Sequence, residues 1–135
     1  MSSILNNIEI INYTKGKPLS GLPFANFKKD ILGKDYALTI IICGKKRAQT
    51  INKKTRGKDY VPNTLSLPYS NKNGEIVLCP DVAKKESKDY ETTPKSYLSY
   101  LLIHSMLHLK GLDHGKKMDL EEKRLVKKHK IRINL

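Results

Sequence analysis

The segment from Thr93 to Gly111 constrains the fold most, because it predicts a helix that is apolar on almost every side. Thr93 is a residue type that caps helix N-termini, and Pro94 suits the first helical position. Gly111 favours the left-handed conformation that ends a helix. Tyrosine, leucine, isoleucine and methionine dominate the residues between them. A helix that is apolar all round needs neighbours on every side, so we expect it to be buried.

Strand and helix patterns are mixed in the rest of the chain. The β-branched segment 36–43 is typical of a buried central strand. Segments 64–68 and 75–79 flank the turn sequence NKNG, which predicts a β-hairpin. A short strand is expected at 8–12, and helices at 21–33, 44–57, 81–90 and 118–131. The pattern predicts an α+β (mixed α/β) fold, in which the buried central helix packs on a mixed, roughly four-stranded sheet with flanking helices.

The length of 135 residues fits one domain, residues 1–135. The N-terminus lacks the pattern of a signal peptide, and no apolar run is long enough to cross a bilayer. Cys43 and Cys79 lie far apart, without CxxC spacing, and are interpreted as buried thiols in a reducing compartment. We therefore expect a cytoplasmic protein without membrane partners.

Basic residues are in large excess and are clustered. Lysine and arginine total 26 against 13 acidic residues, a formal charge of +13, which favours binding to polyanions. Residues 45–58 contain no acidic residue. Their basic residues are Lys45, Lys46, Arg47, Lys53, Lys54, Arg56 and Lys58. Such clusters suit RNA or DNA phosphates, although a merely solvated lysine-rich surface gives the same pattern.

Three of the four histidines lie close together, at His104, His108 and His114. The first two are four residues apart and so share one face of the expected helix. Gly111 lets the chain turn, so that His114 can supply a third nitrogen. Three protein ligands leave a fourth tetrahedral position for water, which is typical of catalytic zinc. Imidazole also binds nickel, copper and iron, and the spacing does not choose among these metals.

The spacing HxxxHxxGxxH is also that of the metzincin proteases. Those enzymes need a glutamate directly after the first histidine, where it acts as the general base. Here that position is Ser105, which cannot serve as that base. The sequence therefore predicts a metal site without the chemistry for peptide hydrolysis.

Two motifs resemble the YbeY family of metal-dependent endoribonucleases. The family motif HGxLHLxGYDH is matched here at His104, Leu107, His108, Leu109, Gly111, Asp113 and His114, with departures at Ser105 and Leu112. The family stretch N…RGKDxPTDVLSFP is matched without a gap at Asn52, Arg56, Gly57, Lys58, Asp59, Leu65, Ser66 and Pro68, whereas Pro62, Asn63 and Leu67 depart from it. The resemblance covers about residues 37–117.

The resemblance implies one zinc ion per chain, held by His104, His108 and His114. It also implies a single-strand-specific endoribonuclease that matures the 3′ end of 16S ribosomal RNA and acts in ribosome quality control in the cytoplasm. Its partners would then be single-stranded RNA, 16S rRNA and ribosomal particles. A non-catalytic, zinc-containing accessory factor that binds RNA or ribosomes is the alternative. The sequence does not indicate the oligomeric state.

We expect Arg56 to stabilise the phosphate charge in the transition state, because guanidinium binds phosphate bidentately. A zinc-bound water is the expected nucleophile, with the 2′-OH of the RNA as the alternative. Asp113 would orient a ligand histidine or shape the turn, and Ser66 would contact phosphate. The RNA backbone would be bound by Lys45, Lys46, Arg47, Lys53, Lys54 and Lys58.

Overall fold

The computed structural model describes residues 2–135, with side chains from residue 6 onward. The strands are β1 (Ser2–Leu5), β2 (Ile8–Asn12), β3 (Ala37–Ile42), β4 (Thr64–Pro68) and β5 (Asn73–Leu78). The helices are α1 (Phe24–Ile31), α2 (Lys45–Arg56), α3 (Pro80–Ser87), a 3₁₀ turn (Lys88–Tyr90), α4 (Pro94–Lys110) and α5 (Lys116–Lys128). These elements confirm the predicted mixed fold class.

The sheet has five strands in the order β1-β2-β3-β5-β4. β3 pairs in parallel with β2 and with β5, whereas β1 and β4 pair antiparallel at the two edges. The four strands expected from the sequence are β2 to β5, including the hairpin of β4 and β5. β1 is an additional edge strand, joined to β2 by Asn6 and Asn7, whose φ angles of 55° and 59° suit a two-residue hairpin turn.

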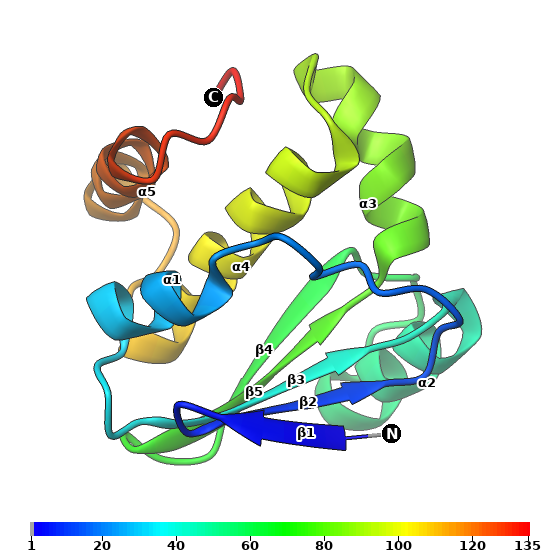
Figure 1. The fold of residues 1–135 in the computed structure, drawn as a ribbon. Helices are drawn as coiled ribbons and strands as arrows, with labels where there is room; N and C mark the ends of the chain where they lie inside the picture. Colours follow the sequence, from blue (N-terminus) through cyan, green and yellow to red (C-terminus); the bar gives the residue numbers. More distant parts are fainter. Residues whose placement is uncertain (1) are drawn as a thin grey trace.

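Helices cover both faces of the sheet. Figure 1 shows α1, α3, α4 and α5 on one side of the sheet and α2 on the other. Alternate residues of β3 reflect this division, because Ile40 belongs to the core under α4 whereas Ile41 packs with Ala48 of α2. The central strand is therefore apolar at every position except Thr39, because both of its faces are covered.

α4 is the buried helix that the sequence predicted. Leu102, Ile103 and Met106 have no exposed surface. The Thr93 hydroxyl accepts a hydrogen bond from the Ser96 amide at 3.1 Å, which caps the first turn. The helix ends at Gly111, whose φ of 109° is easily adopted only by glycine.

Cys43 and Cys79 are both free and buried, as predicted. Within residues 2–135, each helix is too short or too polar to span a lipid bilayer.

Candidate metal centre

The three clustered histidines converge at the C-terminal end of α4. The ring centroids of His104 and His108 are 4.6 Å apart, and that of His114 lies 5.4 Å from the first and 4.7 Å from the second. One nitrogen of each ring lies within 4.8 Å of a nitrogen of the other two. The turn at Gly111 thus brings the three side chains together, and the cluster can hold a metal ion.

Hydrogen bonds fix the orientation of the two helical histidines. Nδ1 of His108 donates to the carbonyl oxygen of Leu112 at 3.0 Å, and Nδ1 of His104 donates to a carboxylate oxygen of Glu122. With the proton on Nδ1, each ring keeps the lone pair of Nε2 for a ligand. Burial, with a smaller contribution from His104, lowers the pKa of His108 and so favours its neutral, metal-binding form. This donor set fits zinc or another divalent transition metal.

Glu122 is a contact that the sequence reasoning missed. It is only 6% exposed and lies on the inner face of α5, together with Met118, Leu125 and Val126. The spacing 118, 122, 125 and 126 is that of the apolar face of a helix. A carboxylate on this apolar face was the signal in the sequence that could have pointed to a partner, since buried charges need partners. The partner, His104, is 18 residues away on another helix.

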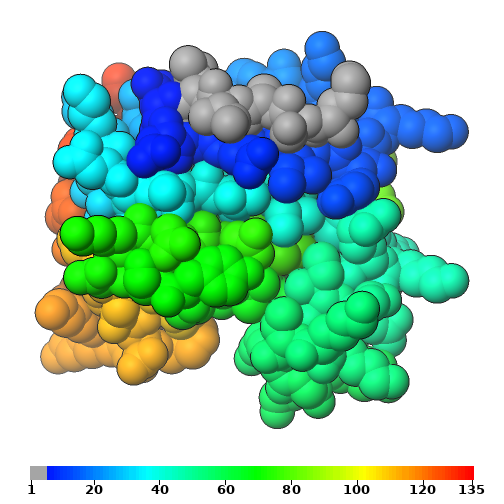
Figure 2. Space-filling view, turned by 90° about the horizontal axis from the view of Figure 1, so that it is seen from below, coloured from blue at the N-terminus to red at the C-terminus, as the bar shows by residue number. Residues whose placement is uncertain are grey.

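The histidines lie in a cleft of about 530 Å³. Its other lining residues are Arg56, Tyr60, Asn63, Thr64, Leu65, Ser66, Pro68 and Asp113. One wall comes from the end of α2 and the loop after it, and the opposite wall comes from the loop between α4 and α5. Figure 2 shows this hollow between the teal segment and the orange segment, below the green strands.

Arg56 lies in the same cleft as the three histidines, although it is 48 residues before His104 in the sequence. It is the last residue of α2, and Gly57 ends that helix with a φ of 67°. The Arg56 guanidinium is exposed and donates from Nη1 to the Tyr60 hydroxyl at 3.2 Å. The fold therefore places a positive charge, oriented by one hydrogen bond, in the same cleft as the three histidines.

Asp113 and Ser66 also line the cleft. Asp113 is exposed, directly before His114. The Ser66 hydroxyl donates to the carbonyl oxygen of Ser105 at 3.1 Å, so that this hydroxyl already has a partner in α4. The Ser105 side chain, fully buried, lies 2.8 Å from the Thr64 hydroxyl. At the position of the protease glutamate, the chain thus carries a residue that joins α4 to β4.

The other basic residues of the 45–58 cluster do not line the cleft. Lys45, Lys46, Arg47, Lys53, Lys54 and Lys58 are all exposed, on α2 or just after it. The Arg47 guanidinium lies 3.7 Å from the centre of the Tyr13 ring, a cation–π contact. These side chains form a basic surface that adjoins the cleft through Arg56.

Comparisons with known proteins agree with the two motifs. The sequence model of a family described as "Endoribonuclease YbeY" matches residues 22–133. A protein of that name from Bdellovibrio bacteriovorus is 41% identical over 92 residues, covering 64% of this chain and 61% of the relative. Another from Cupriavidus metallidurans is 31% identical over 112 residues, covering 76% of this chain and 57% of the relative. This chain therefore spans about three fifths of the length of these relatives.

The fold also has a counterpart among solved structures. The solution structure of TM1509 from Thermotoga maritima aligns with a TM-score of 0.64 at 25% sequence identity. The alignment covers 90% of this chain and 88% of that one. The arrangement of helices around the mixed sheet is therefore shared with a protein of distant sequence.

Proposed function

The chain belongs to the YbeY family of endoribonucleases, and we propose that it cleaves single-stranded RNA with the help of one bound zinc ion. The observation that carries this proposal is the presence of three convergent histidines and Arg56 in one cleft. In this proposal residues 1–135 form a single metallohydrolase domain.

His104, His108 and His114 would hold the metal. A bound zinc ion supplies Lewis-acid polarisation of a phosphoryl oxygen and the activation of water. The protein contributes the orientation of the imidazoles, through Glu122 and the Leu112 carbonyl group. Nickel or another divalent metal satisfies the same three nitrogens, so elemental analysis of the purified protein is needed to identify the ion.

Arg56 would bind the scissile phosphate from the opposite wall of the cleft. Guanidinium groups carry a permanent positive charge in proteins and match two phosphate oxygens at once. The hydrogen bond to Tyr60 restricts its orientation, so that less freedom is lost when the phosphate binds. Charge that develops on the non-bridging oxygens is then stabilised by a group already in place.

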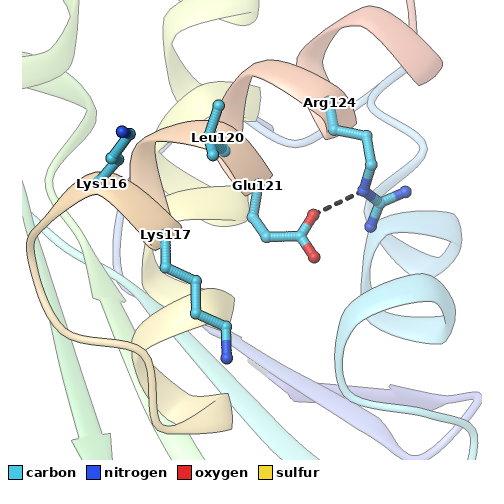
Figure 3. Close-up of a pocket in the computed structure, with 5 residues that line it drawn as sticks. All are labelled: Lys116, Lys117, Leu120, Glu121 and Arg124. Carbon is cyan, nitrogen blue, oxygen red and sulfur yellow. Dashed lines mark hydrogen bonds and ion pairs between the residues drawn. The ribbon is translucent and has the colours of Figure 1, made fainter.

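Single-stranded RNA fits the surroundings of the cleft. Lys53, Lys54 and Lys58 lie beside Arg56 in the chain, and Lys116 and Lys117 follow His114 at the start of α5 (Figure 3). Both walls therefore continue into basic surface, which attracts a phosphate backbone without reading its sequence. Asp113 would orient the loop that carries His114, and Ser66 would keep β4 against α4 while its oxygen faces the cleft.

In this family context we propose 16S rRNA and ribosomal particles as the targets, with roles in 3′-end maturation and ribosome quality control in the cytoplasm. A second candidate is a non-catalytic, zinc-containing factor that binds RNA or ribosomes. One observation favours it: among the described residues that line the cleft, Asp113 carries the only carboxylate, so acid–base groups are few.

A cleavage assay separates the two candidates. The zinc-loaded protein should cut a single-stranded RNA oligonucleotide and leave the matched duplex intact, and a chelator should stop the reaction until zinc is restored. Arg56→Ala should retain stoichiometric zinc but lose cleavage. Tight RNA binding without cleavage, by protein that contains one zinc ion per chain, would contradict the nuclease and favour the accessory factor.

A further inference from the structure

We propose that Glu122 is a positioning residue of the metal centre, which sets the tautomer and orientation of His104 from the neighbouring helix. The inference rests on the proposed function only in that His104 is taken to bind the metal. It adds a residue from α5 to a site whose other parts, the three histidines and Arg56, come from α4, the loop after it and α2.

Both carboxylate oxygens of Glu122 have partners behind the histidine cluster. Oε2 accepts the proton of His104 Nδ1, and Oε1 accepts a hydrogen bond from the Tyr100 hydroxyl at 3.4 Å. Glu122 does not line the cleft that contains the three histidines. It therefore acts on His104 from the side away from the substrate and does not compete for the ligand position. A carboxylate on Nδ1 leaves Nε2 as the unprotonated nitrogen and increases its basicity.

The position of Glu122 is unfavourable for a residue that serves only to pack α5. Met118, Leu125 and Val126, on the same face of α5, are buried apolar residues. Removing a carboxylate from water is unfavourable unless its partners compensate, and an apolar side chain at such a place is often neutral or stabilising. A leucine would continue the apolar face of α5. The carboxylate instead contacts one of the three convergent histidines, which points to a role in metal binding.

His104 and His108 are thus held in different ways. His108 donates to a backbone carbonyl group, which a side-chain substitution does not remove, whereas His104 depends on the side chain of another helix. Among the described residues, Glu122 is the one carboxylate that pairs with a clustered histidine. Removing it should therefore weaken the metal site at one ligand while the other two stay in place.

Zinc affinity, measured by competition with a chromophoric chelator, tests the proposal without any RNA. Glu122→Leu should lower the affinity for Zn²⁺ about 10- to 100-fold, the range typical of lost hydrogen-bond partners of metal ligands. Glu122→Gln keeps an acceptor for Nδ1 but loses the charge, so its affinity should fall in between. Glu121→Gln is the matched control: Glu121 lies next to Glu122 and loses the same charge, but it pairs outward with Arg124 at 2.6 Å (Figure 3). Its zinc affinity should equal that of the wild type.

The tautomer of His104 gives a readout that a merely structural role would not change. In the metal-free wild-type protein, long-range ¹H–¹⁵N spectra should show His104 with its proton on Nδ1. In Glu122→Leu the ring should become a mixture of tautomers, while His108 keeps its Nδ1 proton. If the leucine variant does not fold, Glu122→Gln tests the role through its zinc affinity, because it keeps the size and the acceptor and should leave the His104 proton on Nδ1.

The outcomes separate this inference from the proposed function. Unchanged zinc affinity in the Glu122 variants would overturn the role of Glu122, and so would an unchanged His104 tautomer in Glu122→Leu, whether or not the protein cuts RNA. An equal loss of affinity in Glu121→Gln would overturn it too, because net charge would then explain the effect. If the wild type binds zinc through His104 but cuts no RNA, the nuclease proposal fails and the positioning role stands.

Discussion

Arg56 donates a hydrogen bond to the Tyr60 hydroxyl at 3.2 Å, across the turn that ends α2. Both residues line the cleft that contains the three histidines, and both are exposed. The contact restricts the orientation of the long Arg56 side chain. A guanidinium that is held in place before substrate binds stabilises charge in the transition state at a lower entropic cost.

Tyr60→Phe should therefore reduce the rate of RNA cleavage several-fold, because Arg56 loses the acceptor that orients it. Arg56→Ala should cost more, about 10²- to 10³-fold, as expected for the loss of a transition-state donor. Single-turnover cleavage of an RNA oligonucleotide measures both effects. Tyr13→Phe is the control, since Tyr13 is also exposed but lies against Arg47 and not in the cleft. A Tyr60→Phe enzyme with the wild-type rate would show that Arg56 needs no such support.

His108 should stay neutral at lower pH than an ordinary histidine. Burial lowers its pKa, and the nearby His104 adds to the effect. In the metal-free protein, NMR titration of the His108 ring should give a midpoint below about 6.5, the value of a free histidine. The neutral ring then remains available to a metal as the pH falls through that value.

The matching metal experiment is His108→Ala, which should lose stoichiometric zinc in elemental analysis. His129→Gln is its control, because His129 pairs with Asp30 at 2.9 Å and lies outside the cluster. Full zinc retention in the His108→Ala protein would mean that the ion binds elsewhere.

The convergence of His104, His108 and His114 was predictable from the sequence, whereas the contact of Glu122 with His104 was not. His104 and His108 are one helical turn apart, and Gly111 ends the helix, so local rules of helix geometry place both rings and the turn. Arg56 could be identified only through the resemblance of its motif, since periodicity does not show that the end of α2 lines the same cleft as the three histidines. The apolar face of α5 marks Glu122 as a buried carboxylate that needs a partner, but the identity of that partner, His104, depends on how α5 docks against α4. The edge strand β1 was missed because four residues carry too little pattern.

Ser105 should be a structural residue. It is fully buried and its hydroxyl lies 2.8 Å from that of Thr64 on β4. Ser105→Ala should lower the free energy of unfolding by about 1 kcal/mol, the usual net value of one hydrogen bond. A double-mutant cycle with Thr64→Val in urea, using protein without metal, should show coupling between the two sites. Additive losses would indicate that the hydroxyl groups do not interact.

The two cysteines should resist modification in the folded protein. Both are buried, and burial raises the pKa of the Cys43 thiol to about 11, so that the reactive thiolate is scarce at neutral pH. A chromogenic disulfide reagent should therefore react with neither thiol in native protein and with both in guanidinium chloride. Fast reaction of a thiol under native conditions would show that this part of the sheet opens readily.

The hydrogen bonds of the buried Lys28 amino group should stabilise the fold. The residue is only 1% exposed, and Nζ donates to the backbone oxygens of Lys34 at 2.7 Å and Asn6 at 3.2 Å. Lys28→Met removes the donor of both hydrogen bonds and leaves two carbonyl groups without a partner. The free energy of unfolding should therefore fall by about 1–3 kcal/mol. Urea denaturation measures the change, with the exposed neighbour Lys29→Met as the control.

The same residue predicts a pH dependence with a defined sign. Burial lowers the pKa of Lys28 in the folded state below its usual 10.5, against a smaller opposing effect of Asp35. Between the lowered pKa and 10.5 the unfolded chain binds more protons at this group than the folded chain does, so the contribution of Lys28 to stability rises with pH in that window. Urea midpoints should therefore be measured from pH 8 upward and plotted against pH for the wild type and Lys28→Met. The rise in stability that Lys28 contributes should be absent from the variant. Parallel pH profiles would contradict a perturbed lysine at this position.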